Sequence, residues 1–142
     1  MIEAVLEDVA VAGNGEFFIL LLKTQRGEYV PITIGHLEAM SILAGRASEK
    51  LSRPLSHDLM LSALELLGAT LERVEVTELV TTAEGGTFYG KVVLGSRGVE
   101  VELDARPSDA LGLAVRTGAP IWVAEAVVEQ VGLTDFGSGV EA

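Results

Sequence analysis

Short runs in which apolar and polar residues alternate open the chain, and they predict three β-strands. The runs cover residues 2–11, 16–23 and 28–34. Gly-Asn-Gly at 13–15 and Gln-Arg-Gly at 25–27 separate them, and Gly- and Asn-containing segments of this length are typical of hairpin turns. We therefore expect an antiparallel meander at the start of the chain.

The apolar spacing changes to a helical period after residue 35. Between residues 36 and 51, five apolar positions fall on one helical face: Leu37, Met40, Ala44, Ala47 and Leu51. A second helix is expected to begin at Ser56, a favourable N-cap, and to end before Gly68, a favourable residue just beyond a helix. Two consecutive helices thus follow the first meander.

Three further strands are predicted at residues 70–82, 87–94 and 99–104, again with Gly-rich turns between them. In the last strand apolar residues alternate with acidic ones, which predicts one buried and one acidic face. The apolar set is Val99, Val101 and Leu103, and the acidic set is Glu100, Glu102 and Asp104. The pattern ends with a helix at 108–117, a short strand at 120–123 and a helix at 125–131.

Strands joined by hairpins, with the helices in blocks, indicate the α+β class. We expect a single domain over residues 1–133, made of two antiparallel three-stranded meanders with packed helices. The Gly-rich residues 134–142 are expected to form a flexible C-terminal tail.

The amino-acid composition limits the kinds of core and of active site that the chain can form. Hydrophobic residues make up 49% of the 142 residues but aromatic residues only 5%, so the core should be aliphatic. The absence of cysteine excludes disulfides, thiolate zinc sites and a cysteine nucleophile. The N-terminal residues lack the pattern of a secretory signal, and no uncharged run reaches the roughly 18 residues of a membrane span. We therefore expect a cytoplasmic protein without a membrane segment.

The charge balance opposes passive nucleic-acid binding. Ten Lys and Arg residues are scattered among 21 Asp and Glu residues, giving a net charge of −11 and no basic stripe. Phosphodiester chemistry is still compatible with this surface, because carboxylates that hold a divalent cation present positive charge to a phosphate. The cofactor is left open, with a divalent cation such as Mg²⁺ as one option.

Two turns, at residues 53–58 and 104–109, each place Arg, Pro, Ser and Asp where a helix begins. Helix capping explains them without any function, since Pro, Ser and Asp all favour the first helical turn. The functional alternative is that helix N-termini and Arg bind a phosphate while Asp holds a cation or a water molecule. The residue types alone allow both the helix-capping interpretation and the phosphate-binding interpretation.

Single residues carry the same ambiguity. His57 is suited to proton transfer near neutral pH, but a histidine in the first turn of a helix is more often only solvated or hydrogen-bonded. Glu38 is favoured in a first helical turn by the helix dipole, or it is a ligand or the partner of an Arg. Asp104 ends an acidic strand face that solvent alone would explain, although a strand-to-helix junction also suits a ligand.

Five segments in order give the chain a resemblance to the bifunctional nuclease domain family, named for activity on RNA and DNA. They are Pro-Ile-Thr-Ile-Gly at 31–35 with Glu38-Ala39, Arg-Pro-Leu-Ser-His-Asp-Leu-Met at 53–60, Thr-Phe-Tyr-Gly at 87–90, Asp-Ala-Arg-Pro-Ser-Asp-Ala at 104–110, and Pro-Ile-Trp-Val at 120–123. The resemblance implies that the signature polar positions are Glu38, Arg53, His57, Asp58, Asp104, Arg106 and Asp109. It extends over about residues 2–133.

The leading hypothesis is a nuclease that hydrolyses phosphodiester bonds in RNA or DNA. In this hypothesis, four carboxylates hold water or a divalent cation, and His57 transfers a proton. The carboxylates are those of Asp58, Asp104, Asp109 and Glu38. Arg53, Arg106 and Ser108 are the expected substrate-binding residues.

The alternative hypothesis is a non-catalytic interaction or regulatory domain, a homo-oligomer whose Arg-Pro turns fix the helices through Arg–Asp pairs. A third is a small-anion-binding module that uses the helix N-termini. Geometry discriminates between them: structural pairs should be buried and mutually satisfied, whereas a site should open on a cleft.

Overall fold

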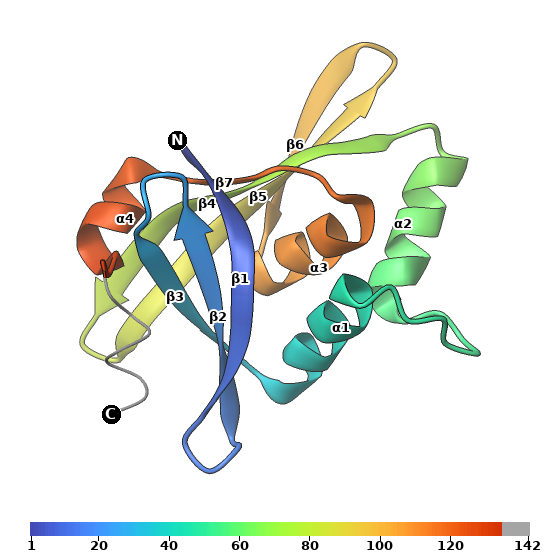
Figure 1. Ribbon diagram of the computed structural model, residues 1–142. Helices are drawn as coiled ribbons and strands as arrows, with labels where there is room; N and C mark the ends of the chain where they lie inside the picture. Colours follow the sequence, from blue (N-terminus) through green and yellow to red (C-terminus); the bar gives the residue numbers. More distant parts are fainter. Residues whose placement is uncertain (135–142) are drawn as a thin grey trace.

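The computed structural model describes residues 1–134 as one curled seven-stranded sheet with four helices (Figure 1). The strand order across the sheet is β3-β2-β1-β7-β4-β5-β6. The strands are β1 (Ile2–Ala12), β2 (Phe17–Thr24), β3 (Tyr29–Ile34), β4 (Thr70–Thr82), β5 (Gly85–Ser96), β6 (Val99–Ala105) and β7 (Ile121–Val123). The helices are α1 (His36–Arg46), α2 (Ser56–Leu66), α3 (Pro107–Thr117) and α4 (Glu125–Val131).

The α+β class is confirmed, but the expectation of two meanders is incomplete. Strands β1 to β3 and β4 to β6 each form an antiparallel meander, and β7 joins the two into one sheet. It pairs antiparallel with β1 and parallel with β4, so that Val123 is opposite Ile2 on one side and Val76 on the other. The sheet is therefore mixed. Sequence patterns do not reveal such pairings, because the partners lie far apart along the chain.

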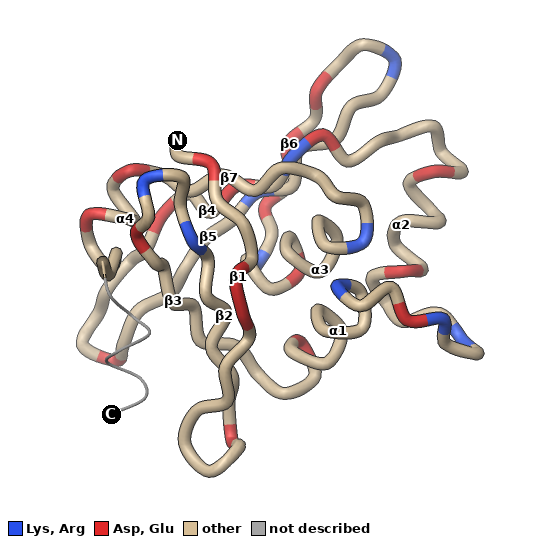
Figure 2. Tube along the Cα trace, viewed as in Figure 1, with Lys and Arg blue, Asp and Glu red and all other residues tan. Residues whose placement is uncertain are grey.

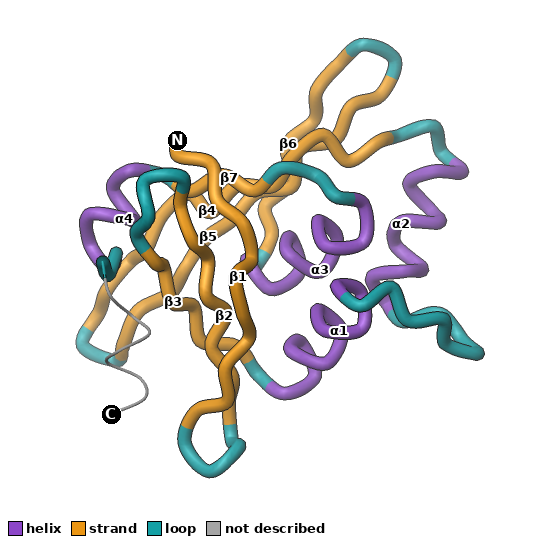
Figure 3. Tube along the Cα trace, viewed as in Figure 1, coloured by secondary structure: helices purple, strands orange, loops and turns teal. Residues whose placement is uncertain are grey.

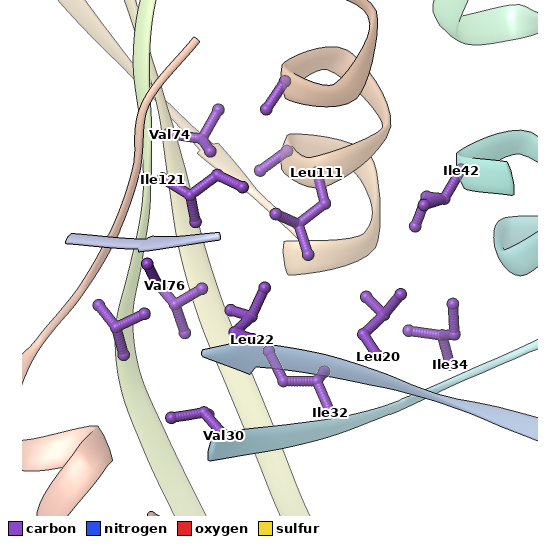
Figure 4. Close-up of a cluster of buried hydrophobic side chains, with 14 of the residues drawn as sticks. Leu20, Leu22, Val30, Ile32, Ile34, Ile42, Val74, Val76, Leu111 and Ile121 are labelled. Atoms are coloured by element: carbon purple, nitrogen blue, oxygen red, sulfur yellow. The ribbon is translucent and has the colours of Figure 1, made fainter. Parts of the chain in front are cut away.

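Helices α1, α2 and α3 gather on one side of the molecule, and α4 lies apart from them (Figure 3). The core is aliphatic, as the composition predicts, and it fills the space between the curled sheet and helices α1 and α3 (Figure 4). Its fully buried members include Leu20, Leu22, Val30, Ile42, Val74, Val76 and Leu111. This packing holds the starts of α1 and α3 close together.

The expected apolar face of the first helix is wrong. The buried residues of α1 are Ala39, Ile42 and Gly45, whereas Leu37 is 81% exposed. The helix also ends at Arg46 rather than near residue 51. Small residues allow α1 to approach α3 closely, so the larger apolar side chains are turned outward.

The expected N-cap of the second helix, Ser56, is also wrong. Leu55 caps α2 and Ser56 is its first helical residue, while the backbone N–H of Leu55 donates to Asp58 Oδ2 at 2.9 Å. In α3, Arg106 is the N-cap and Pro107 takes the first position, where its missing N–H costs nothing. Gly118 ends α3 in the left-handed conformation with φ of 76°, as Gly at this position predicts.

Strand β6 departs from its expected half-buried pattern. It is an edge strand of the sheet, and Val99, Val101 and Leu103 are exposed along with the acidic residues between them. The paired residues of β5, Val92 and Leu94, are buried, so the core face of the sheet continues beyond the cover of the helices.

The predicted flexible tail, apart from Thr134, lies outside the described residues. Within residues 1–134, no helix is both long and apolar enough to span a bilayer.

Candidate functional site

Two clefts meet where the start of α1 faces the start of α3. The first, here called the β3–β5 cleft, has a volume of about 410 Å³ and is lined by Ile32, Thr33, Ile34, Gly35, Glu38, Gly86, Thr87, Phe88, Arg106, Pro107 and Ser108. The second, the α1–α2 cleft, has a volume of about 380 Å³ and is lined by Leu37, Glu38, Met40, Ser41, Leu55, Ser56, His57, Arg106 and Asp109. Glu38 and Arg106 therefore border both clefts.

Asp109, in the first turn of α3, is the centre of the polar network between the clefts. Its carboxylate accepts hydrogen bonds from Arg106 Nε at 2.9 Å and Arg106 Nη2 at 3.3 Å, and it lies 3.0 Å from His57 Nε2. Burial raises the pKa of Asp109, but the hydrogen bonds from Arg106 and His57 outweigh it and hold the pKa below the ordinary value. Asp109 is thus a fixed carboxylate at the edge of the α1–α2 cleft.

Arg106 bridges two carboxylates and still faces solvent. Beyond its two bonds to Asp109, its Nη1 lies 3.5 Å from Glu38 Oε2, and its side chain is 65% exposed. Hydrogen bonding to Asp109, followed by the charge of the same carboxylate, raises the pKa of Arg106 above its usual value. Arg106 is therefore a permanent cation presented to both clefts.

His57 is buried and uses both ring nitrogens. Nδ1 lies 2.6 Å from Ser41 Oγ, and Nε2 lies 3.0 Å from Asp109 Oδ1. A neutral ring with its proton on Nε2 satisfies every group: the ring donates to Asp109 and accepts from Ser41, whose oxygen accepts from Arg116 Nη2 at 3.2 Å. Compared with a Ser-His-Asp triad, the two ring nitrogens have exchanged partners. His57 thereby holds Asp109 in place.

A second Arg–Asp pair lies behind His57 and ties the three helices together. Arg116, with a side chain only 7% exposed, donates from Nε to Asp58 Oδ1 at 2.7 Å and from Nη1 to the carbonyl of Gly112 at 2.7 Å. The hydrogen bond from Arg116, with a further one from the Leu55 backbone, lowers the pKa of Asp58. Arg116 is buried and Asp58 is partly exposed, and together they link α2 to α3 as a structural ion pair.

Two glycines make room for this arrangement. A Cβ on Gly112 of α3 would lie 2.6 Å from Cε1 of His57, and one on Gly45 of α1 would lie 2.5 Å from Nη1 of Arg116. Both contacts are too close for a real Cβ, so any side chain here would displace the polar groups. The two glycines therefore allow His57 and Arg116 to lie where they do.

The structure brings Glu38, His57, Arg106 and Asp109 together, and it links Asp58 to them through Arg116 and Ser41. Ser108 is buried and borders the β3–β5 cleft. Asp104 is instead exposed on β6, opposite Lys91 in the strand register, and Arg53 is exposed between α1 and α2. Neither Asp104 nor Arg53 lines one of the two clefts.

Sequence reasoning missed Ser41 and Arg116. Ser41 lies three residues after Glu38, and Arg116 lies seven residues after Asp109, so each shares a helical face with a candidate residue. That spacing is a signal which the turns at 53–58 and 104–109 alone do not contain. Polar residues one or two turns after a candidate carboxylate would have been the place to search.

A preformed metal centre is not seen in residues 1–134, since no three or more His, Asp or Glu side chains converge closely enough to bind an ion. The side chains that could hold a cation are Glu38 and Asp109, and the guanidinium of Arg106 already lies between them. A divalent ion at this place would have two carboxylates as protein ligands and would complete its shell with water and a phosphate, which suits Mg²⁺.

The fold and this cluster define an α+β domain with an Arg–carboxylate site between two helix starts. The chain belongs to the bifunctional nuclease domain family, whose model matches residues 19–135. An uncharacterized protein of Mycobacterium tuberculosis is 38% identical over 116 residues, covering 81% of this chain and 66% of that protein.

Plant relatives are more distant. Bifunctional nuclease 1 of Oryza sativa is 29% identical over 119 residues, and Bifunctional nuclease 2 of Arabidopsis thaliana is 26% identical over 121 residues. These matches cover 80% and 85% of this chain but only 35% and 36% of the plant proteins. The chain thus corresponds to about one third of the length of each plant nuclease.

Proposed function

We propose that the protein is a nuclease that hydrolyses phosphodiester bonds at the junction of the two clefts. The observation that carries the proposal is Arg106, a mostly exposed cation fixed between Glu38 and Asp109. A guanidinium in this setting matches the geometry of a phosphate and stabilises the negative charge that develops during its hydrolysis. The family and the names of the plant relatives support the choice of nucleic acid as substrate.

The carboxylates act on the attacking water. Glu38 and Asp109 flank Arg106, so a water molecule held by one of them lies next to a phosphate bound by Arg106. The water oxygen forms the new bond to phosphorus, its proton passes to the carboxylate, and the ester oxygen leaves with a proton from solvent. His57 is a positioning residue in this scheme, because it is buried and contacts Asp109 rather than the open cleft.

Glu38 and Asp109 would hold any divalent cation at this place, and such an ion would supply extra positive charge beside the two carboxylates and the phosphate. Without it, Arg106 alone must offset Glu38, Asp109 and the phosphate. If Glu38 and Asp109 bind such an ion, activity requires Mg²⁺ or Mn²⁺ and is lost in EDTA. If Arg106 suffices, EDTA leaves the rate unchanged.

The test is cleavage of labelled RNA and DNA by the wild type and by Arg106→Ala and Asp109→Asn, each with Mg²⁺, Mn²⁺ or EDTA. Removal of one such donor typically lowers the rate about 100-fold to 1,000-fold, and we expect this for Arg106→Ala. Arg26→Ala is the matched control, since Arg26 is also exposed and paired with a carboxylate, Glu28, but lies at the β2–β3 turn. A wild type without cleavage, or an Arg106→Ala variant as active as Arg26→Ala, would refute the proposal.

The second candidate, a homo-oligomeric interaction domain, is favoured by the outer face of α2. Leu66 and Leu67 are 87% and 78% exposed, and Leu59 and Met60 are exposed beside them. A helix that is apolar around most of its circumference is normally buried. We propose that a second copy covers this face, because a twofold contact places apolar residues on both sides and apposes few of the chain's many negative charges.

Light scattering coupled to size-exclusion chromatography tests this assembly. A Leu66→Glu/Leu67→Glu variant is expected to elute as a monomer under conditions where the wild type is a dimer or larger. Val11→Glu, at an exposed position on β1, is the control and should not change the mass. A monomeric wild type would rule the assembly out. The nuclease assay on the monomeric variant then shows whether assembly matters for cleavage.

A further inference from the structure

The two clefts are adjacent and share Glu38 and Arg106, but their other walls differ. We propose that they bind two successive nucleotides of a single strand, with the phosphate that joins them at Arg106. This inference rests on the proposed nuclease function and adds to it the class of substrate. It assigns a role to each cleft that the cluster of polar residues alone does not define.

Size is the first argument. The volumes of about 410 and 380 Å³ lie near the lower end of small-ligand sites, about 300–1,000 Å³. A base that enters either cleft must leave its neighbours in the stack. A single strand does this at little cost, whereas a duplex must first break pairing and stacking. The clefts therefore favour a strand whose bases are already free.

The β3–β5 cleft has an aromatic wall. Phe88 of β5 is half-buried and borders this cleft, with the hydroxyl-bearing Thr33 and Thr87 exposed nearby. Stacking of a base on an aromatic ring is independent of sequence, since every base has a π-face. The hydroxyls offer both a donor and an acceptor to the edge of the base or to the sugar.

The α1–α2 cleft is aliphatic instead. It is lined by Leu37 and Met40, which are exposed on α1, and by Leu55, and the side chains of Ser41 and Ser56 also border it. This wall contacts a base through dispersion and apolar burial without an aromatic stack. The nucleotide here contributes less binding energy from its base than the one in the β3–β5 cleft.

Charge also favours one strand. In the described residues, Arg106 is the only Lys or Arg that lines either cleft. Figure 2 shows the basic positions scattered between acidic ones along the chain rather than gathered in one stripe. One cation can engage one phosphate at the junction, but a duplex brings a second backbone that meets no basic partner.

The experiment compares cleavage of one labelled oligonucleotide alone and annealed to its complement, using the full chain. The single strand is expected to be cleaved at least about tenfold faster, since each lost stacking contact costs that order of affinity. Phe88→Leu keeps an apolar side chain in the partly buried position but removes the π-face, and it should raise KM for the single strand. Tyr89→Leu, on the neighbouring exposed position of β5 and outside the clefts, is the matched control.

Binding of a thymidine dinucleotide with a nuclease-resistant phosphorothioate link is followed in parallel by amide NMR shifts. Chemical-shift changes in both clefts that disappear in Arg106→Ala support the inference, even if no oligonucleotide is cleaved. The absence of cleavage would in that case refute the nuclease function but not the binding of two nucleotides. Equal cleavage of duplex and single strand, shifts in one cleft only, or equal effects of Phe88→Leu and Tyr89→Leu would overturn the inference while leaving the nuclease function intact.

Discussion

Arg106 and Arg116 each pair with an aspartate, but their surroundings give the two pairs different tasks. The side chain of Arg116 is buried and its other donors are taken by Gly112 and Ser41. Removing a partner from such a group leaves an uncompensated buried charge, which is strongly destabilising. Arg106 is exposed, so loss of its ion pairs costs little stability. Substitutions at Arg116 should therefore affect folding, and substitutions at Arg106 should affect chemistry.

Gly112→Ala tests the close contact behind His57. In an ordinary helix this change stabilises by about 1 kcal/mol, because Ala has the higher helix propensity. Here the new Cβ would meet the His57 ring at 2.6 Å, and we expect a net destabilisation of about 1–3 kcal/mol together with a shifted imidazole. Urea unfolding and NMR of the imidazole nitrogens measure both effects. A Gly112→Ala variant at least as stable as the wild type would contradict the contact.

The lowered pKa values of Asp58 and Asp109 predict a loss of stability in acid. A carboxyl group whose pKa is lower in the folded state stabilises the protein above its unfolded pKa, about 3.9, and this contribution is lost as the pH falls through the folded value. Asp58→Asn should therefore reduce stability at pH 7 and flatten its decline below about pH 4. Urea midpoints at neutral and acidic pH measure the change.

Asp104→Asn is the control for this pH dependence, because Asp104 is exposed on β6 and, within residues 1–134, forms no ion pair with Arg106 or Arg116. It should retain the wild-type decline in acid. An Asp58→Asn variant with an undiminished decline would show that the acid sensitivity arises from other groups.

At the level of elements, local patterns predict where helices and strands occur but not what covers them. The strand at residues 70–82 and the helix at 125–131 agree with the prediction residue for residue. The buried face of α1 differs from the prediction because Ala39 and Gly45 pack through their small size, which a hydrophobicity pattern undervalues. Likewise, the alternation in β6 is regular, but burial depends on whether a distant helix reaches the sheet edge.

For the candidate site, too, the sequence predicts local features but not contacts between distant segments. The turns that contain His57 and Arg106 are visible in the sequence, whereas the approach of Asp109 to His57 spans 52 positions and depends on packing between helices. Helical spacing marks Ser41 and Arg116 as residues worth testing, but their contacts with His57 and Asp58 depend on that packing. Non-local contacts among helices are therefore what the sequence pattern could not supply.

Helix α2 is predicted to open more easily than α3. Its buried residue in the described structure is His57, while α3 buries seven residues against the sheet and α1. Elements with few buried contacts exchange their amide hydrogens through low-energy local openings. Hydrogen exchange should therefore show weak protection of α2 in dilute solution. If a second copy covers its outer face, protection should rise with protein concentration; uniformly strong protection at all concentrations would contradict the exposed state of α2.

At the scale of the whole molecule, β7 and the net charge set the conditions for function. By joining the two meanders, β7 places the end of β3 and the start of α1 from one half beside β5 and the start of α3 from the other. Both clefts are thus built from segments that are distant in sequence. The net charge of −11 opposes long-range attraction of a polyanion, so the proposed nucleic-acid substrate would be held by few local contacts.

The acidic net charge and the small number of basic contacts predict a weak salt dependence of nucleic-acid binding. Each phosphate neutralised on a single strand contributes about −0.7 to the slope of log K against log salt concentration. With Arg106 as the basic residue of the described clefts, we expect a slope of about −0.7 to −1.5, and a slope nearer zero for Arg106→Ala. Fluorescence anisotropy of a labelled single strand over a range of KCl concentrations measures it. A slope of about −4 or steeper would mean that roughly six or more phosphates are neutralised, and would require a basic surface that the scattered Lys and Arg residues do not provide.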